Sequence, residues 1–429
     1  MTSTVSYTSE VLSIEGGRRL SGRVRVSGSK NATLPILFAT ILTDNECSIH
    51  DAPDLLDVHS TIKLLEFLGA GVERSGSTIR VNPAGIKNRK TPEEIVRKMR
   101  ASILAIGPLL GRFSRAVVSL PGGCSIGSRP IDQHLKFFQK AGASVKIKGG
   151  FVYLNVEEKK PVEFTFDLIT VTGTENALLY LATIEGESVL NNIALEPEVM
   201  DLIHVLKKMG AEISVDGRRA LIKGTGSPSN FEHRVIPDRI EAGTLMVASA
   251  ITEGDVVIDN VVPAHLGAVI EKLREYGTHI EAVGAGSIRV VGQDGGNNLT
   301  IETSEYPGFP TDMQAQFCSL LSVTQGRSIV VERIFENRFQ HVSELVRMGA
   351  NITVKNRTAY IEGVEKLWGA TVNSTDLRAS ASLVLAGLVA EGTTIVREIH
   401  HLDRGYERLE EKLRKLGASI RRLPDGYEI

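Results

Sequence analysis

Two patterns of hydrophobic and polar positions recur along the whole chain. The first is a short helix with charges on one face, then a glycine, then the alternation typical of a strand. It occurs six times, at Gly69, Gly142, Gly210, Gly277, Gly349 and Gly417. Glycine ends a helix readily because it adopts the left-handed conformation without a Cβ penalty. We therefore predict six exposed helices, each ended by one of these glycines and followed by a strand.

The second pattern is a helix of small apolar residues, then a turn, then a β-branched strand. Clear copies span 176–190, 243–258 and 380–396, and weaker copies span 32–49, 101–120 and 314–331. A helix that is apolar on all sides must be buried. Each repeat unit therefore has one inner helix, one outer helix and several strands. A period of about 70 residues is too long for a thin solenoid, so six units favour two domains of three units.

The boundary between these domains is predicted from the repeats. A break near 232–238 separates the third unit from the fourth, and a first strand at Val11–Ile14 precedes the first unit. We predict an inserted domain at 30–237 and a discontinuous domain made of 1–29 and 238–429. The chain would cross between them twice, near 27–30 and 234–238.

Composition excludes several classes of protein. The 429 residues include 49 Lys and Arg against 51 Asp and Glu, which argues against a dedicated nucleic-acid binder. Three cysteines cannot form a disulfide framework and indicate a reducing compartment, and no Cys/His spacing suggests zinc. There is no apolar signal core at the N-terminus and no run approaching the ~20 apolar residues of a membrane span. We expect a cytoplasmic protein without membrane contact.

Polar residues cluster where the inner helices begin. Helix capping accounts for many of them: Thr172 with Glu175 fits a capping box, and Asp238 with Glu241 resembles one. Capping does not account for the cations Lys30, Arg100 and Arg378, because a positive charge is unfavourable near a helix N-terminus. Several helix N-termini with added cations suggest a polyanionic ligand.

Four segments are too polar and irregular for packing alone: 27–35, 119–134, 308–317 and 400–413. They carry the motifs PGGCSIGSRPIDQH and FPTDMQAQF, and FENR and DLRASASLVLAG stand at 335–338 and 376–387. On these motifs the sequence resembles the UDP-N-acetylglucosamine enolpyruvyl transferases, also called 1-carboxyvinyltransferases, from about Ile14 to Ile420. The resemblance implies an α/β fold of two inside-out α/β barrels, each of three repeats with buried inner helices.

The resemblance also implies a reaction. The enolpyruvyl group of phosphoenolpyruvate would pass to the 3-hydroxyl of UDP-N-acetylglucosamine with release of phosphate, at the start of peptidoglycan synthesis. The partners would be these two small molecules, with no cofactor and no metal. No carboxylate cluster suited to magnesium stands out in the sequence.

Cys124 follows two glycines in a loop between a strand and a helix. Most cysteines behave as small hydrophobes, and Cys47 and Cys318 lie in apolar patterns that fit this behaviour. The resemblance implies that Cys124 is the general acid that protonates C3 of phosphoenolpyruvate. A thiol pKa of about 8.5 keeps it protonated at neutral pH. The same resemblance implies alkylation by fosfomycin.

Asp312 lies in a first helical turn, where an acidic residue is favoured by the helix dipole. The resemblance makes it the carboxylate beside the sugar 3-hydroxyl. It could take the hydroxyl proton directly or orient the hydroxyl, and the sequence does not choose between these roles.

The resemblance assigns the substrate contacts residue by residue. Lys30 and Asn31 match a pair that contacts phosphoenolpyruvate and the sugar nucleotide, and Arg100 matches another substrate arginine. Arg404 matches an arginine that swings in to bind phosphoenolpyruvate. A single Arg or Lys is usually a solvated surface charge, but together these cations suit phosphate and carboxylate.

The nucleotide contacts are spread over the chain. The stretch that matches the uridine site is Arg129, Pro130, Ile131, Asp132 and Gln133. The remaining matches are Thr172 and Gly173 near the diphosphate, Ile334 at the nucleotide sugar, and Arg338, Asp376 and Arg378 in the cleft. Pro130 also suits a first helical position, which is its structural alternative.

Two departures from the family pattern bear on nucleotide-sugar specificity. The chain reads Val171-Thr172-Gly173-Thr174 where the family commonly reads Ser-Val-Gly-Ala-Thr, and it has Leu195 where a cation is common. A related enzyme acting on another uridine nucleotide is therefore the main alternative. The GGC loop and RPIDQH argue against shikimate-type transfer. A silent scaffold is disfavoured by the joint retention of Lys30, Cys124, Arg129, Asp312 and Arg404.

Overall fold

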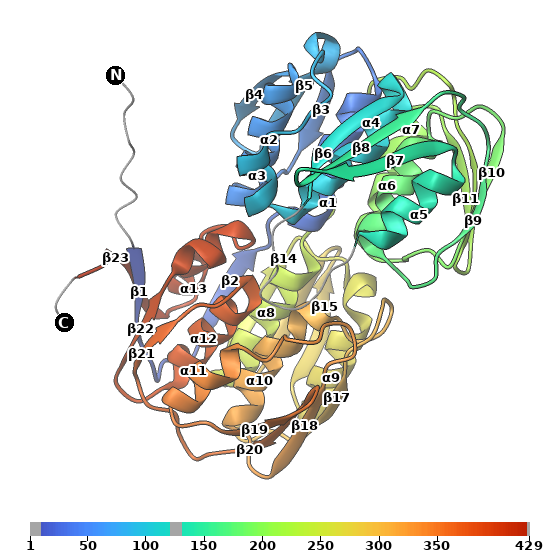
Figure 1. Ribbon diagram of the computed structural model, residues 1–429. Helices are drawn as coiled ribbons and strands as arrows, with labels where there is room; N and C mark the ends of the chain where they lie inside the picture. Colours follow the sequence, from blue (N-terminus) through green and yellow to red (C-terminus); the bar gives the residue numbers. More distant parts are fainter. Residues whose placement is uncertain (1–9, 121–130, 427–429) are drawn as a thin grey trace. The chain divides into compact units, whose positions relative to one another are not determined.

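The structure is a computed structural model that describes residues 10–120 and 131–426. The described residues divide into two compact units. We call residues 10–26 and 237–426 the terminal unit, and residues 27–120 and 131–236 the inserted unit. Figure 1 shows the helices and strands of each unit.

Each unit contains three sheets within its described residues. In the terminal unit the strand orders are β15-β16-β14-β2, β17-β18-β20-β19 and β21-β22-β1-β23. The strands are β1 (Glu10–Glu15), β2 (Ser21–Arg25), β14 (Asp255–Asp259), β15 (His279–Gly284), β16 (Ser287–Val291), β17 (Thr300–Glu302), β18 (Arg327–Val331), β19 (Asn351–Lys355), β20 (Thr358–Glu362), β21 (Thr371–Asn373), β22 (Thr393–Arg397) and β23 (Ser419–Pro424). Each of these sheets joins one parallel pair to two antiparallel pairs.

The inserted unit repeats this plan with one variation. Its orders are β13-β3-β5-β4, β11-β12-β10-β9 and the three-stranded β6-β8-β7. The strands are β3 (Cys47–His50), β4 (Gly71–Ser75), β5 (Thr78–Asn82), β6 (Arg115–Ser119), β7 (Ala143–Lys148), β8 (Phe151–Val156), β9 (Glu163–Thr165), β10 (Glu187–Asn191), β11 (Glu212–Asp216), β12 (Arg219–Lys223) and β13 (Glu232–Arg234). A single parallel bridge from Lys90 to Val117 stands where the other sheets have a parallel edge strand.

The predicted division into inner and outer helices is confirmed. The inner helices are α1 (Lys30–Ala39), α4 (Ile106–Phe113), α6 (Val171–Leu181), α8 (Arg239–Ile251), α10 (Gln314–Ser322) and α12 (Leu377–Val389), and most of their residues are buried. The outer helices are α2 (Leu56–Leu68), α5 (Asp132–Lys140), α7 (Pro197–Lys208), α9 (Gly267–Tyr276), α11 (His341–Arg347) and α13 (Leu409–Lys415). The six glycines that follow the outer helices all have positive φ, from 90° at Gly142 to 117° at Gly277, as predicted.

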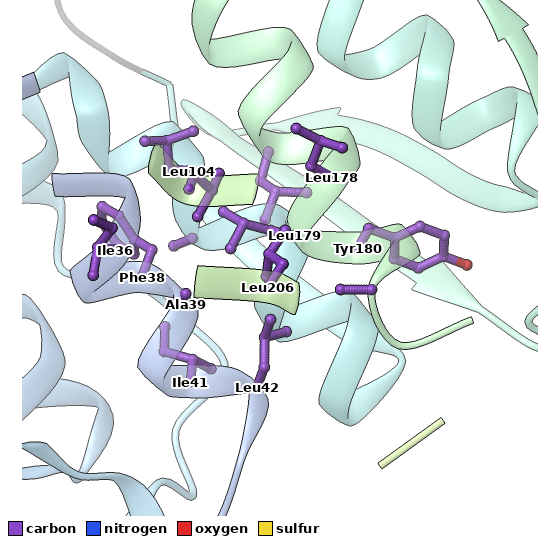
Figure 2. Packing of buried hydrophobic residues seen from close by; sticks show 14 of the residues in the cluster. Ile36, Phe38, Ala39, Ile41, Leu42, Leu104, Leu178, Leu179, Tyr180 and Leu206 are labelled. Carbon is purple, nitrogen blue, oxygen red and sulfur yellow. The ribbon is translucent and has the colours of Figure 1, made fainter. Parts of the chain in front are cut away.

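Apolar side chains from several helices form the core of the inserted unit. Figure 2 shows Ile36 and Phe38 of α1 near Leu104, Leu179 and Leu206. Removing one such side chain costs about 2–5 kcal/mol, because the neighbours do not close the cavity fully. The terminal unit has its own core, in which α8, α10 and α12 pack on one another.

Two local predictions are wrong. The cap of α6 is Thr170, whose Oγ1 accepts from Gly173 N at 3.2 Å, so Thr172 does not form a capping box with Glu175. The inner helix predicted within 101–120 begins as a 3₁₀ segment, η3 (Arg100–Ala105), and becomes α-helical only at Ile106. By contrast, Asp238 caps α8 through the amides of Ile240 and Glu241.

Candidate functional site

Lys30 is the first residue of α1 in the inserted unit. Its Nζ lies 3.2 Å from Asp57 Oδ2 on α2, and only 12% and 7% of the two side chains are exposed. The helix dipole opposes a cation at this end of a helix, and the Asp57 carboxylate offsets that repulsion. Asn31 follows and is half-buried. The arrangement holds an ammonium group at the start of an inner helix.

A buried network joins Thr172 to the centre of the inserted unit. Asn176 Oδ1 accepts from Gly107 N at 2.6 Å, so its Nδ2 is the donor to His134 Nδ1 at 3.0 Å. His134 Nε2 then carries the ring proton and donates to Thr172 Oγ1 at 3.2 Å. Burial, and then the nearby Arg100 guanidinium, lower the pKa of His134 to about 4. The imidazole is therefore neutral at pH 7.

The same asparagine ties the segment that carries Arg100 to α6. Asn176 Nδ2 also donates to Ile103 O at 2.9 Å, in η3. α4 and α6 approach closely here, because a Cβ on Gly107 would meet Asn176 O at 2.3 Å. Arg100 is the first residue of η3, three residues before Ile103.

A buried acidic group lies one residue before Asn176. Burial raises the pKa of Glu175 well above its usual range, and Glu198 and Glu196 raise it further. Leu195 packs against the hydrophobic core and brings no charge. The protonated form of Glu175 is therefore favoured relative to that of an exposed glutamate.

The segment predicted to hold the uridine is described only in part. Cys124, Arg129 and Pro130 lie outside the described residues. Ile131 directly precedes α5, which begins at Asp132. The side-chain amide of Gln133 makes two hydrogen bonds with Asp167. Its Oε1 accepts from Asp167 N at 2.9 Å, and its Nε2 donates to Asp167 Oδ2 at 3.1 Å.

In the terminal unit, two guanidinium groups hold the Asp312 carboxylate. Arg338 Nη2 donates to Asp312 Oδ1 at 2.6 Å, and Arg378 donates to Oδ2 from Nη2 at 2.8 Å and from Nε at 3.2 Å. The arginine side chains are 5% and 3% exposed, whereas that of Asp312 is 26% exposed. Burial alone would raise the pKa of Asp312, but Arg378 and Arg338 hold it well below its usual range.

Arg378 is positioned by its helix as well as by Asp312. Asp376 caps α12 and accepts from the backbone amides of Arg378 and Ala379. The guanidinium lies over the Tyr406 ring, 5.3 Å from the centroid. Its Nη1 is buried and makes no hydrogen bond within the described part of the chain. A donor of this kind beside a carboxylate suits a ligand oxygen or a water.

Tyr406 anchors the segment that follows Arg404. Its buried hydroxyl lies 2.9 Å from Thr244 Oγ1 and accepts from Gln316 Nε2 at 3.1 Å. Gln316 Nε2 also donates to Asp312 O at 2.9 Å. Arg404 is the last residue of the 3₁₀ segment η6 (Ile399–Arg404) and is half-buried.

The described candidate residues lie in both units, and hydrogen bonds join some of them. Direct contacts join Asp312, Arg338 and Arg378, and Asp376 is joined to them through the cap of α12. Thr172 is joined to His134, and Gly173 donates to Thr170. Sequence reasoning missed Asp57, His134, Asn176 and Tyr406. The signals were weak: Tyr406 lies in the HLDRGYE segment, and His134 ends the RPIDQH motif.

Two features are absent from the described residues. No group of three or more His, Cys, Asp or Glu residues in the described ranges is arranged to hold a metal ion. Within the same ranges, no helix has the length and apolar character required to cross a membrane.

Comparison with known proteins gives a consistent result. Residues 14–413 match the family model of EPSP synthase (3-phosphoshikimate 1-carboxyvinyltransferase). The chain is 52% identical over 411 residues to a UDP-N-acetylglucosamine 1-carboxyvinyltransferase of Desulfosudis oleivorans, covering 96% of this chain and 98% of that protein. It is 50% identical to the protein of the same name from Myxococcus xanthus, covering 95% and 98%.

Solved structures agree at the level of fold. The enolpyruvyl transferase NikO from Streptomyces tendae superimposes with a TM-score of 0.87 at 25% identity, covering 97% of this chain and 99% of NikO. EPSP synthase from Acinetobacter baumannii gives a TM-score of 0.75 at 18% identity, covering 97% and 100%. The predicted α/β architecture of repeated units with buried inner helices is that of these transferases.

Proposed function

This chain belongs to the enolpyruvyl transferase family, with the UDP-N-acetylglucosamine 1-carboxyvinyltransferases, and from that premise we propose its reaction. It transfers the enolpyruvyl group of phosphoenolpyruvate to the 3-hydroxyl of UDP-N-acetylglucosamine, releases phosphate and thereby begins peptidoglycan synthesis. The observation that carries the proposal is the identity of about 50% over nearly the whole chain to relatives of that name.

The cations are assigned to the anionic substrate. Lys30, Arg100 and Arg404 bind the phosphate and carboxylate of phosphoenolpyruvate. In support, Lys30 is held by Asp57, and the segment that carries Arg100 is held by Asn176. A guanidinium or ammonium fixed in advance loses less entropy when an anion binds. These side chains supply the positive charge, and the reaction as proposed uses no metal and no cofactor.

The chemistry is addition followed by elimination. The sugar O3 bonds to C2 of phosphoenolpyruvate while C3 takes a proton from the Cys124 thiol, which gives a tetrahedral intermediate. The Cys124 thiolate then takes a proton back from C3, and the bond from C2 to the phosphate oxygen breaks. Inorganic phosphate departs, and the enol ether remains as the product.

Asp312 is assigned to the 3-hydroxyl. Two guanidinium groups make its carboxylate a weak base, because they stabilise the charged form. The hydroxyl becomes acidic only as O3 bonds to C2, so the carboxylate first orients the hydroxyl and accepts its proton late. The fixed geometry of Asp312 with Arg338 and Arg378 supports the orienting role.

The remaining residues are assigned to the nucleotide sugar. Asn31, Ile334, Arg338, Asp376 and Arg378 serve the sugar, Thr172 and Gly173 the diphosphate, and Arg129, Pro130, Ile131, Asp132 and Gln133 the uridine. The unpartnered Nη1 of Arg378 supports a ligand oxygen near this group. The network through His134 supports a fixed Thr172 hydroxyl. We also retain the proposal that residues 30–237 form an inserted domain.

Phosphate release tests the reaction and its acceptor together. The full chain is incubated with phosphoenolpyruvate and, in separate reactions, UDP-N-acetylglucosamine, UDP-glucose, UMP or shikimate 3-phosphate. We expect release with UDP-N-acetylglucosamine. Phosphate release only with UMP would show that UDP-N-acetylglucosamine is not the acceptor. No release with any acceptor would favour a scaffold protein without catalytic activity.

A thiol-specific reagent tests Cys124. Burial raises the pKa of Cys47 to about 11, and burial followed by Glu332 raises that of Cys318. Both thiols should therefore resist alkylation in the folded protein. Fosfomycin should modify Cys124, as located by mass spectrometry of the treated protein. Adducts on Cys47 or Cys318 with Cys124 unmodified would overturn the assignment.

Cys124 variants give a second test. Cys124→Asp should resist fosfomycin and keep some activity, because a carboxylic acid can also donate the proton. Cys124→Ser should lose most activity, since a hydroxyl is a far weaker acid. We place the reaction in the cytoplasm, and the free thiols of Cys47 and Cys318 suit such a reducing compartment.

A further inference from the structure

Glu332 is a fully buried carboxylate in the terminal unit, one residue beyond β18. Its Oε1 accepts from Thr303 Oγ1 at 2.9 Å, from Ile334 N at 2.8 Å and from Phe335 N at 3.1 Å. Its Oε2 accepts from Thr311 Oγ1 at 2.8 Å. A buried charge is tolerated only when its hydrogen-bonding capacity is satisfied, and here four donors satisfy it.

The two oxygens of Glu332 support different parts of the site. Oε1 holds the backbone turn that contains Ile334. Oε2 holds the hydroxyl of Thr311, the residue before Asp312. This side chain therefore joins two segments assigned to the nucleotide sugar, although it lies in neither of the motifs FPTDM and FENR.

The Oε2 contact sets the direction of a longer chain of hydrogen bonds. Thr311 has one hydroxyl proton, and it donates that proton to Glu332. Its oxygen is then free to accept from Arg338 Nη1 at 2.8 Å. The other nitrogen of the same guanidinium, Nη2, donates to Asp312 Oδ1 at 2.6 Å. Bonds of this kind to a full charge are shorter and stronger than neutral ones.

We propose that Glu332 is a positioning residue for the transfer reaction: through the Thr311 hydroxyl it fixes Arg338, and through Arg338 it fixes the carboxylate of Asp312. This inference rests on the proposed function. It adds a buried residue that touches no substrate and whose charge orients the group beside the 3-hydroxyl.

The amide variant Glu332→Gln separates the two oxygens. A glutamine whose oxygen takes the Oε1 position keeps all three donors there. Its NH₂ group then faces Thr311, so the hydroxyl must accept where it had donated, and its proton turns toward Arg338. The turn that contains Ile334 should survive this change, whereas the contact from Thr311 to Arg338 should not.

A double-mutant cycle tests the proposal. Turnover and KM are measured by phosphate release for the parent, Glu332→Gln, Thr311→Val and the double variant. Each single variant should lower kcat by about tenfold and leave KM for the nucleotide sugar within about threefold. The double variant should be no slower than the slower single variant, because both changes break one chain of bonds.

Thr303→Val is the matched control. This change also removes a buried threonine hydroxyl that donates to Glu332, but that hydroxyl donates to Oε1 instead of Oε2. It should lower the melting temperature and leave kcat within about twofold of the parent. A purely structural role for Glu332 would lower kcat in Thr303→Val as much as in Thr311→Val.

The outcomes are distinguishable. Additive losses of about 100-fold in the double variant, or parent-like kcat in Thr311→Val, would overturn the inference while leaving the proposed function intact. No phosphate release by the parent would overturn the proposed function itself, and this inference with it. If Glu332→Gln does not fold, Thr311→Val alone tests the inference. A kcat about tenfold lower with KM within about threefold supports it, and a parent-like kcat overturns it.

Discussion

The two units hold their charged groups in different ways. In the terminal unit, the Asp312 carboxylate forms ion pairs with Arg338 and Arg378, and all three side chains are largely buried. In the inserted unit, Lys30 is paired with the single carboxylate of Asp57, and the other contacts described above are neutral. The uncharged imidazole of His134 and the amide of Asn176 join Thr172 to the segment that carries Arg100.

This difference indicates what each unit can offer a ligand. A carboxylate compensated by two arginines is fixed in orientation and is a weak base. In the inserted unit, by contrast, the cation Lys30 is paired with the Asp57 carboxylate at the start of an inner helix. The Asp312 group of the terminal unit is therefore suited to orienting a hydroxyl.

The largest expected effect comes from removing the Asp312 charge. Asp312→Asn should lower turnover by about 10²–10⁴-fold, because an amide cannot accept the hydroxyl proton. It should also cost about 3–5 kcal/mol of unfolding free energy, since two buried guanidinium groups lose their carboxylate. Phosphate release and urea unfolding measure the two losses. Near-normal turnover would show that Asp312 is only structural.

The corresponding change in the inserted unit acts on neutral bonds. Asn176→Ala removes the contacts to Ile103 O, Gly107 N and His134, and should cost about 2–4 kcal/mol of unfolding free energy. It should raise KM for phosphoenolpyruvate severalfold, because the segment that carries Arg100 is released. The exposed Asn230→Ala is the control and should change stability by about 0.5 kcal/mol or less. Equal effects of the two variants would refute the role of Asn176.

The pH dependence of stability tests the neutral imidazole. The pKa of His134 is about 4 in the folded chain and about 6.5 when unfolded. Between these values the unfolded chain binds more protons, so this stabilisation is complete above pH 6.5 and falls as the pH approaches 4. This pKa shift corresponds to at most about 3 kcal/mol of unfolding free energy.

The variant His134→Asn isolates this contribution. It keeps an acceptor near Nδ1 for Asn176 but cannot ionise, so its unfolding free energy should fall less between pH 7 and pH 5. Burial also lowers the pKa of His341 in the terminal unit to about 4. His341 therefore contributes a similar pH dependence of stability to the parent and to the variant. Identical slopes for parent and variant would show that His134 is not buried as a neutral group.

The smallest expected effect is at an exposed ion pair of the terminal unit. Asp255 accepts two hydrogen bonds from Arg289, at 2.8 and 2.6 Å, which resembles the contact between Asp312 and Arg378. Because solvent screens this pair, Asp255→Asn should move Tm by about 2 °C or less and leave turnover unchanged. A large effect would mean that carboxylate–arginine geometry, and not burial, distinguishes Asp312.

Local sequence signals predicted the repeated elements well. The glycine that ends each outer helix is predicted from its own backbone preference, without knowledge of distant contacts. The burial of the inner helices is predicted from their apolar residues alone. The motif residues Asp312, Arg338 and Arg378 do meet in the structure. The assignments of Lys30, Arg404 and the uridine segment stay predictions.

The missed residues act across long separations in the chain. Asn176 bonds to a carbonyl 73 residues earlier, and Glu332 bonds to a hydroxyl 21 residues earlier. Neither pairing leaves a local pattern, because each depends on how helices and strands pack. The error at the cap of α6 has a similar origin: Thr170 and Thr172 are equally good caps by residue type, and the surrounding structure selects the first.

The pairing of β1 has a consequence for biosynthesis. β1, near the start of the chain, lies between β22 and β23, near its end (Figure 1). On the ribosome, residues 27–236 are complete long before β23 is translated, so the inserted unit can fold on the nascent chain. The sheet that contains β1 must wait for the last strand to emerge. Until then the unpaired edges of β1 are exposed to other nascent chains and to chaperones.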